Sequence, residues 1–365
     1  MLFNLFKKTK EDQVRTNNYL TLRIRETVVE TPDTITVYFD QPEPFLDYKA
    51  GQFLTVILEI DGKEERRSYS LCTSPYVDPF PAITVKRLKE GLVSNYINDR
   101  FRPGKTISVM KPMGNFITDY HSKNKRHYGM IAGGSGITPI MGIIKSVLVN
   151  EPESKVSLLY CSRTEDLIIF GKALENLREK YAGRLEIIHN LSQPKGDWKG
   201  LKGRLDSKKI EAFVNVKFIG PEWDNRFFLC GPQGIMDLAR ETLLAAGYEK
   251  ERLYSESFYL EPSGNEIPED TNGQVVRSVT IILDGQEHIV EVIPGKTILE
   301  AGLAEDLDMP YSCQSGLCTA CRGKLLSGEV KMNEDAGLSE NEIKEGYILC
   351  CSARPTGPNI RINIE

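Results

Sequence analysis

Three cysteines near the end of the chain, Cys313, Cys318 and Cys321, have the spacing C-x4-C-x2-C. A short loop with this spacing wraps three thiolates around one [2Fe–2S] cluster, and small residues between the cysteines let backbone N–H groups approach the sulfurs. A fourth thiolate has to come from elsewhere, and Cys350 and Cys351 are the next cysteines along the chain. The alternative is zinc, but zinc ribbons bring two close pairs rather than three cysteines plus one. The spacing therefore predicts an iron–sulfur cluster.

The composition is that of an ordinary soluble globular protein. The chain has 365 residues, enough for two or three domains, with 40% hydrophobic and 27% charged residues. No apolar run is long enough to span a bilayer, and residues 1–10 lack the apolar core of a signal peptide, so we expect no stable membrane insertion. The eight cysteines are not spaced as a disulfide framework, which predicts a cytoplasmic protein.

Acidic residues are concentrated at the cysteine-containing end. The net charge is −5, but residues 277–365 hold 14 Asp and Glu against 8 Lys and Arg, and residues 261–276 hold four acidic and no basic residues. This distribution argues against a nucleic-acid partner. It suggests an acidic electron carrier that docks on a more basic protein, although ordinary solvated surface charge is an equal alternative.

The pattern of apolar residues changes twice along the chain. Residues 17–122 contain short β-branched and aromatic runs, with a hairpin turn at Asp61-Gly62, and this predicts an antiparallel β-barrel. Residues 123–260 alternate strands and helices, which predicts an α/β doubly wound parallel sheet. Residues 261–276 are rich in Pro, Gly, Asn and acids and are expected to form a linker. Residues 277–365 begin with another hairpin, followed by a helix capped by Thr297.

Arg67-Ser68-Tyr69-Ser70 ends a predicted barrel strand. A Tyr ring can stack on an isoalloxazine, and Arg can pair with a pyrophosphate. This tetrapeptide resembles the flavin signature Arg-x-Tyr-Ser of the plant-type ferredoxin–NADP reductase family. Gly91-Leu92-Val93-Ser94 resembles the family's second flavin element, where backbone N–H groups bind phosphate. The resemblance implies FAD rather than FMN, with Ser70 near the flavin N5 and with Lys86 and Thr138 as further contacts.

Two glycine turns resemble the nicotinamide nucleotide site of the same family. Gly133-Gly134-Ser135-Gly136 precedes a helix, so its backbone can approach a pyrophosphate. Cys230-Gly231-Pro232 resembles the nicotinamide end of the site, which implies that Cys230 lies near the hydride-donating ring. By the same resemblance Glu256 belongs to the catalytic group, and Phe258 covers the flavin until nicotinamide displaces it.

The coenzyme preference depends on the segment after the second strand of this domain. Ser162 and Arg163 stand where the adenosine ribose is expected, and no Asp or Glu directly follows them. Arg163 could bind a 2′-phosphate, which favours NADPH, but NADH remains possible because Arg also occurs here in some NADH users.

From Ser278 onward the chain resembles plant-type ferredoxin, which implies a β-grasp fold. In that register Cys351 is the fourth cluster ligand, and Cys350 is expected to point to the opposite side of an extended segment. Reductase first and ferredoxin last is the order found in reductase subunits of the phenylacetyl-CoA epoxidase family. Reductases of steroid 9α-hydroxylases have the same order.

These features predict an oxidoreductase that passes electrons from NADPH through FAD and a [2Fe–2S] cluster to the oxygenase of a multicomponent monooxygenase, with phenylacetyl-CoA epoxidase as the first candidate. The alternatives are a reductase for a steroid or aromatic-ring hydroxylase and, from another class, a zinc-stabilised interaction protein without enzymatic activity. The sequence does not identify the terminal acceptor.

Overall fold

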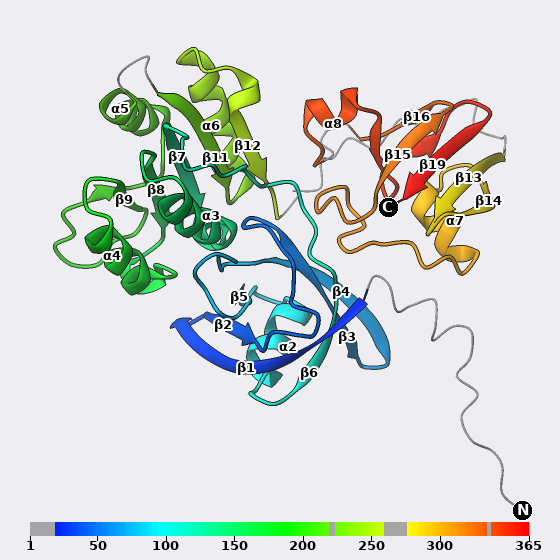
Figure 1. The fold of residues 1–365 in the computed structure, drawn as a ribbon, viewed down its shortest axis with the longest axis horizontal. Coiled ribbons are helices and arrows are strands. Elements are labelled where there is room, and N and C mark those ends of the chain that lie inside the picture. Colours follow the sequence, from blue (N-terminus) through cyan, green and yellow to red (C-terminus); the bar gives the residue numbers. More distant parts are fainter. Residues whose placement is uncertain (1–18, 219–222, 259–275, 334–336, 365) are drawn as a thin grey trace, which may run out of the picture.

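Residues 19–218, 223–258, 276–333 and 337–364 are described by the computed structural model and fold into three modules (Figure 1). They are an antiparallel barrel, a doubly wound parallel sheet and a mixed sheet of the ferredoxin type, so the predicted fold classes are confirmed. The module limits at residues 17–122, 123–260 and 277–365 stay predictions. The expected linker, 261–276, lies outside the described residues except for Val276.

The barrel contains six antiparallel strands in the order β4-β3-β6-β1-β2-β5. An isolated bridge between Leu71 and Ile83 joins its two ends. The helix α2 packs Val93 and Ile97 into the barrel core. The elements are β1 (Tyr19–Thr31), β2 (Thr34–Phe39), β3 (Phe53–Ile60), β4 (Lys63–Ser70), β5 (Ala82–Lys86), α2 (Leu92–Arg100) and β6 (Thr106–Met110).

The second module is a parallel sheet in the order β10-β9-β8-β7-β11-β12, with helices on both faces (Figure 1). Side chains of α3 and α4 pack on one face, and those of α5 and α6 pack on the other. The elements are β7 (Arg126–Gly133), α3 (Ile137–Asn150), β8 (Lys155–Ser162), α4 (Gly171–Lys180), β9 (Leu185–Leu191), β10 (Leu201–Lys202), α5 (Ser207–Lys217), β11 (Asp224–Cys230), α6 (Gln233–Ala245) and β12 (Leu253–Glu256).

The third module is a mixed sheet in the order β14-β13-β19-β15-β17, in which β13 and β19 run parallel. The predicted helix cap is present: Thr297 accepts a hydrogen bond from the Glu300 N–H, and the Glu300 carboxylate accepts from the Thr297 N–H. The elements are β13 (Arg277–Leu283), β14 (Gln286–Val292), α7 (Ile298–Ala304), β15 (Arg322–Ser327), β16 (Val330–Lys331), α8 (Glu340–Lys344), β17 (Tyr347–Leu349), β18 (Arg354–Pro355) and β19 (Ile360–Ile364).

Candidate functional site

A cavity of about 570 Å³ opens where the three modules meet. Its wall combines the end of β4, parts of the barrel around β5 and α2, the start of α3, and the cysteine loop of the third module. The lining residues are Arg67, Ser68, Tyr69, Ser70, Thr84, Lys86, Leu88, Ser94, Ser135, Thr138, Phe258, Ser312, Cys313, Gln314, Ser315 and Leu317. The cavity therefore brings predicted flavin contacts and one predicted cluster ligand into one wall.

Two cations of the barrel stand in this wall. Arg67 is half-exposed and forms an ion pair with Glu65 at 3.2 Å, while its Nη1 also donates to the Arg66 carbonyl at 2.6 Å. Lys86 lies 3.5 Å from an Asp33 carboxylate oxygen. Both cations lie in the cavity wall, where an anionic ligand could reach them, and this suits a nucleotide diphosphate.

The amino end of α2 is a second feature that suits phosphate. Gly91 is the N-cap residue and provides no side-chain cap, so the first N–H groups of α2 are left for another acceptor. Ser94 Oγ accepts from the Leu88 N–H at 3.1 Å, which fixes the turn before the helix. Leu92 and Val93 begin the helix but, with Gly91, do not line the cavity.

The glycine turn after β7 touches the turn after β11. A Cβ at Gly136 would lie 2.0 Å from the Cys230 carbonyl oxygen, and one at Gly133 would lie 2.7 Å from Pro232, so both positions require glycine. In this sheet β7 lies between β8 and β11, so the strand order reverses beside it. A nucleotide binds at such a crevice in doubly wound folds.

Within that turn, Gly134 has φ +54°, and the Thr138 hydroxyl donates to the Ser135 carbonyl at 2.9 Å. Gly231 begins the turn on the β11 side, and its α-carbon would lie 3.7 Å from a Cβ added to Gly133. The two turns thus leave backbone, rather than side chains, facing the crevice.

Cys230, Ser70 and Glu256 come together beside the cavity, although they lie far apart in the sequence. Cys230 and Glu256 are paired in register on β11 and β12, and the Ser70 hydroxyl donates to Glu256 Oε2 at 3.0 Å. Burial raises the pKa of the Glu256 carboxyl to about 8, and the hydrogen bond from Ser70 lowers it in part. Burial also raises the pKa of the fully buried Cys230 thiol. The trio can hold a proton near neutral pH next to the cavity.

Ser162 and Arg163 lie apart from the cavity, at the carboxyl end of β8. Ser162 is buried and Arg163 is exposed, and the Arg163 carbonyl accepts from the Gln193 N–H at 2.8 Å. Two acidic residues farther along this turn, Glu165 and Asp166, are both bound by Lys195. Among the described residues Arg163 forms no ion pair.

The cysteine loop gathers four thiols. Cys313 Sγ accepts from the N–H groups of Ser315, Leu317 and Cys318 at 3.3–3.4 Å. Hydrogen bonds from the neighbouring Cys318 and Cys351 thiols lower the pKa of Cys313, and the Ser315 N–H adds to this effect. Gln314, Gly316 and Thr319 have positive φ, which turns the loop's N–H groups toward sulfur. N–H groups directed at sulfur suit cluster thiolates.

The fourth thiol comes from Cys351. Its Sγ accepts from the Gly316 N–H at 3.2 Å, and its own N–H donates to Cys321 Sγ at 3.4 Å. The described residues contain no group of three or more His, Cys, Asp or Glu side chains arranged for a single metal ion. Instead the thiols follow one another in the order 318–313–351–321. Four neighbouring thiols in this order fit a [2Fe–2S] cluster, in which four cysteine sulfurs bind two irons.

Cys350 lies next to Cys321, but its thiol accepts no hydrogen bond from the backbone of the other described residues. It is fully buried in the core of the third module, and its N–H donates to the Cys321 carbonyl at 3.0 Å. The expected extended conformation is wrong, because residues 350–352 form a turn closed by hydrogen bonds from Ser352 and Ala353 to the Leu349 carbonyl. Both cysteines belong to the core of this module, and only Cys351 Sγ also accepts a hydrogen bond from the cysteine loop.

Sequence reasoning missed several cavity residues. Thr84 lies on β5 and Leu88 follows this strand, and Ser312, Gln314 and Leu317 are close in sequence to the first loop cysteine. Gln314 and Leu317 lie inside the recognised cysteine segment and Ser312 directly precedes it, so their place beside a cluster could have been predicted. That these residues also line the flavin cavity depends on how the barrel packs against the third module, and no local sequence pattern indicates this packing.

Comparisons with known proteins agree with this arrangement. Family profiles match an oxidoreductase FAD-binding domain at residues 20–117, an oxidoreductase NAD-binding domain at 130–241 and a 2Fe-2S iron-sulfur cluster binding domain at 281–356. One component of 1,2-phenylacetyl-CoA epoxidase from Escherichia coli is 34% identical over 349 residues, covering 94% of this chain and 97% of that protein. No helix in the described segments has the length and apolarity needed to cross a membrane.

Another relative is the ferredoxin reductase component of 3-ketosteroid-9-alpha-monooxygenase from Mycobacterium tuberculosis, 34% identical over 367 residues, with 97% of this chain and 98% of that protein covered. The solved structure of phthalate dioxygenase reductase has the same fold, with a TM-score of 0.57, 23% identity, and 95% and 98% of the two chains covered. The chain therefore belongs to the family of FAD- and [2Fe–2S]-dependent NAD(P)H oxidoreductases that includes the reductase components of oxygenases.

Proposed function

We propose that this protein takes hydride from NADPH and delivers single electrons to the oxygenase of a phenylacetyl-CoA epoxidase-type monooxygenase. The observation that carries the proposal is the shared cavity, in which Arg67 to Ser70 of β4 face Ser312 to Leu317 of the cysteine loop. When bound, FAD supplies the exchange between two-electron and one-electron chemistry, and the [2Fe–2S] cluster supplies a one-electron relay.

For FAD, we assign stacking to Tyr69, diphosphate binding to Arg67 and Lys86, and phosphate binding to the N–H groups of the segment Gly91 to Ser94. The cavity wall and the uncapped start of α2 support this assignment. Ser70 and Glu256 would orient the flavin edge where hydride arrives, with Cys230 close by. Phe258, which packs against the core of the second module, would cover the ring.

For the cluster, we assign Cys313, Cys318, Cys321 and Cys351 as ligands. Hydrogen bonds from backbone N–H groups to sulfur support these four, whereas the Cys350 thiol accepts none from the other described residues. A visible spectrum separates this assignment from a zinc site, because flavin and a ferric cluster absorb and zinc does not.

For the coenzyme, we assign NADPH, with Ser162 and Arg163 holding the 2′-phosphate. Support comes from the exposed Arg163 side chain and from the Lys195 ammonium, which pairs with Asp166 and offsets its charge, while the Lys195 backbone N–H binds Glu165. Arg163→Ala should raise the KM for NADPH by about tenfold, the loss expected for one charge-assisted contact, and leave that for NADH nearly unchanged. An equal effect on both coenzymes would show that Arg163 only supports the fold.

The terminal partner is tested by reconstitution. The protein is mixed with NADPH and with purified oxygenase components, first of phenylacetyl-CoA epoxidase and then of a 3-ketosteroid 9α-hydroxylase, and substrate turnover is measured. We expect coupled turnover with the first. The steroid system is the second candidate, because its reductase is also 34% identical, and turnover only with the steroid oxygenase would overturn the assignment.

We also propose a cytoplasmic location. All eight cysteines are free, and four of them are needed as thiolates by the cluster. Cell fractionation with a cytoplasmic marker enzyme tests this, and recovery in an oxidising extracytoplasmic compartment would contradict it.

A further inference from the structure

The third module is attached to the barrel by contacts that border the cysteine loop. The Tyr19 hydroxyl, at the start of β1, donates to Asp308 Oδ1 at 2.6 Å. The guanidinium carbon of Arg66 on β4 lies 4.1 Å from the centre of the Tyr311 ring. In Figure 1 the third module lies on the side of the barrel where β4 and the beginning of β1 are drawn. These contacts join the barrel to the segment directly before the first loop cysteine.

A second attachment lies beyond the loop. The Asn115 amide, in the segment after β6, donates to Glu342 Oε1 on α8, and Arg322 donates to the same oxygen at 2.9 Å. Glu342 is itself fixed, because its other carboxylate oxygen accepts from the Ser339 N–H at 2.9 Å. The cysteine loop is thus fixed to the barrel on both sides, through Asp308 and Tyr311 before it and through Glu342 of α8 after it.

The first attachment, formed by Tyr19 and Arg66, is a rigid contact because the Arg66 side chain is buried and surrounded by partners. Arg66 is 7% exposed, and its charge is balanced by Glu64 at 2.7 Å and by two aromatic rings, Tyr311 and the more distant Tyr19. Burial, and next the hydrogen bond to Asp308, raises the pKa of Tyr19 to about 12. The Tyr19 hydroxyl therefore keeps its proton at any physiological pH and remains the donor to Asp308.

Strand β4 contributes residues both to the cavity wall and to the contacts with the third module. Arg66 of β4 contacts the third module, the next residue, Arg67, lines the cavity, and Ser68 does both, because its hydroxyl donates to Ser312 Oγ at 2.9 Å. Since strand residues are held in register by the ladder to β3, the place of the cysteine loop over the cavity is set by the same rigid element that forms the cavity wall.

We propose that Tyr19, Arg66 and Asn115 are positioning residues that hold the cysteine loop at electron-transfer distance from the flavin cavity. This rests on the proposed function. Each hydride from NAD(P)H brings two electrons into the cavity, the electrons leave singly, each reduces a ferric cluster by one electron, and the proton is released. Electron transfer falls exponentially with separation, so loosening the attachment slows this step and leaves hydride transfer unchanged.

The test uses the triple variant Tyr19→Phe/Arg66→Leu/Asn115→Ala of the full-length, cofactor-loaded protein. In anaerobic stopped-flow experiments with NADPH, flavin bleaching and ferricyanide reduction should stay within about twofold of wild type, while cluster reduction slows by at least about tenfold. Arg66→Lys in place of Arg66→Leu should restore part of the rate, because it keeps a cation against Tyr311. Arg23→Leu is the matched control, because the β1 residue Arg23 forms an exposed ion pair with Asp40.

A second readout does not depend on turnover. Hydrogen exchange of the backbone amides in the Asp308–Ser312 segment should be faster in the triple variant than in wild type and unchanged in Arg23→Leu. If Arg66→Leu prevents loading, Tyr19→Phe/Asn115→Ala is measured in both assays. Unchanged cluster reduction, equal slowing of flavin and cluster, or unchanged exchange would each overturn the proposal. Failure of wild type to reduce its cluster with NAD(P)H would instead refute the proposed function, and the exchange measurement would still decide whether these residues hold the module.

Discussion

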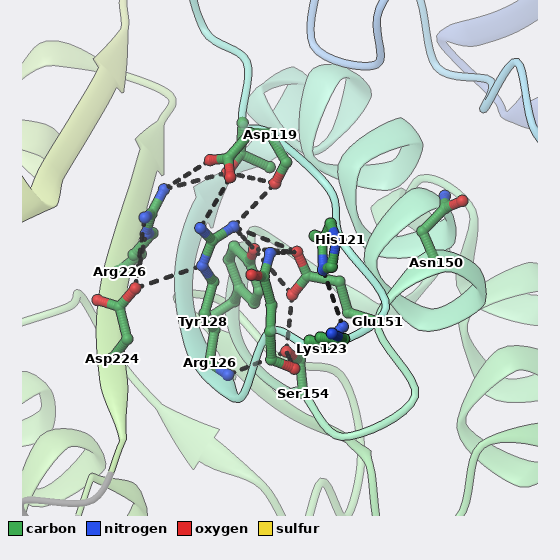
Figure 2. Close-up of polar contacts among 12 residues, drawn as sticks. Asp119, His121, Lys123, Arg126, Tyr128, Asn150, Glu151, Ser154, Asp224 and Arg226 are labelled. Atoms are coloured by element: carbon green, nitrogen blue, oxygen red, sulfur yellow. Dashed lines mark hydrogen bonds and ion pairs between the residues drawn. The ribbon is translucent and has the colours of Figure 1, made fainter.

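Two carboxylates, the fully buried Glu151 and the partly buried Glu256, lie at opposite ends of the strands of the parallel sheet and have different surroundings. Glu151, near the amino ends of the strands, is fully buried and accepts hydrogen bonds from the side chains of Arg126, Tyr128 and Ser154 (Figure 2). The Asn124 amide also donates to Glu151. Arg126 is paired in addition with acidic residues on both sides. The result is a network in which the charges of Glu151 and Arg126 offset each other.

Glu256, at the carboxyl edge, has one described side-chain partner, the Ser70 hydroxyl, and sits beside the cavity. With so few donors, burial dominates and raises its pKa to about 8. A carboxylate surrounded by donors stabilises the fold, whereas one left short of donors next to a cavity can take up or release a proton. The surroundings of Glu151 therefore suit a structural role, whereas those of Glu256 suit proton exchange.

The same contrast applies to the neighbouring cysteines and gives the largest expected effect. Both side chains belong to the apolar core of the third module, but Cys351 Sγ accepts a hydrogen bond from the Gly316 N–H of the cysteine loop, whereas the Cys350 thiol accepts none from the other described residues. Cys351→Ser should abolish or badly distort the visible spectrum of the cluster. Cys350→Ser should retain that spectrum with some loss of stability. The reverse pattern would make Cys350 the ligand.

Glu151→Gln should cause the next largest effect, on stability. Asp119 and Asp224 would still pair with Arg126, but the buried amide would replace an acceptor oxygen with an NH2 group facing other donors, which costs about 1 to 3 kcal/mol in the free energy of unfolding. Urea denaturation measures the loss. The exposed ion pair of Glu175 with Arg178 provides the control, and Glu175→Gln should change nothing measurable. If Glu151→Gln were equally harmless, the network would not be structural.

How much of the fold and of the site could be predicted depends on how far apart in the sequence the interacting residues lie. The cap of α7 by Thr297 and the glycine turn at Gly133 are local patterns, and both are present. The network of Glu151 escaped notice because its donors come from separate turns and strands. The helix α5 was not predicted, although its N-cap residue Asp206 is a local signal. The bond from Tyr19 to Asp308, by contrast, joins residues 289 positions apart. Long-range pairing of ordinary polar residues leaves no pattern in a single sequence.

Glu256→Gln should mainly affect hydride transfer. The amide keeps the shape of the side chain but cannot take up or release a proton, and loss of this proton exchange should lower the rate by about tenfold to a hundredfold. Stopped-flow reduction of the flavin by NADPH gives this rate. The unfolding free energy at pH 7 should change less than in Glu151→Gln. A variant that reduced flavin normally would remove Glu256 from the chemistry.

The smallest expected effect is the pH dependence of stability. The Glu256 pKa is raised to about 8 in the folded protein from an ordinary value of 4.5, so the folded state binds the proton more tightly than the unfolded state. Its contribution is fully present below pH 4.5 and is lost as the pH rises through 8. Because the side chain lies beside an open cavity, we expect wild type to lose about 1 to 2 kcal/mol relative to Glu256→Gln between pH 6 and 8. Thermal unfolding of both proteins without NAD(P)H across this range measures the difference. A flat difference would mean that the carboxyl is ionised throughout, as expected for a well-solvated group, and the contrast with Glu151 would then lose its electrostatic basis.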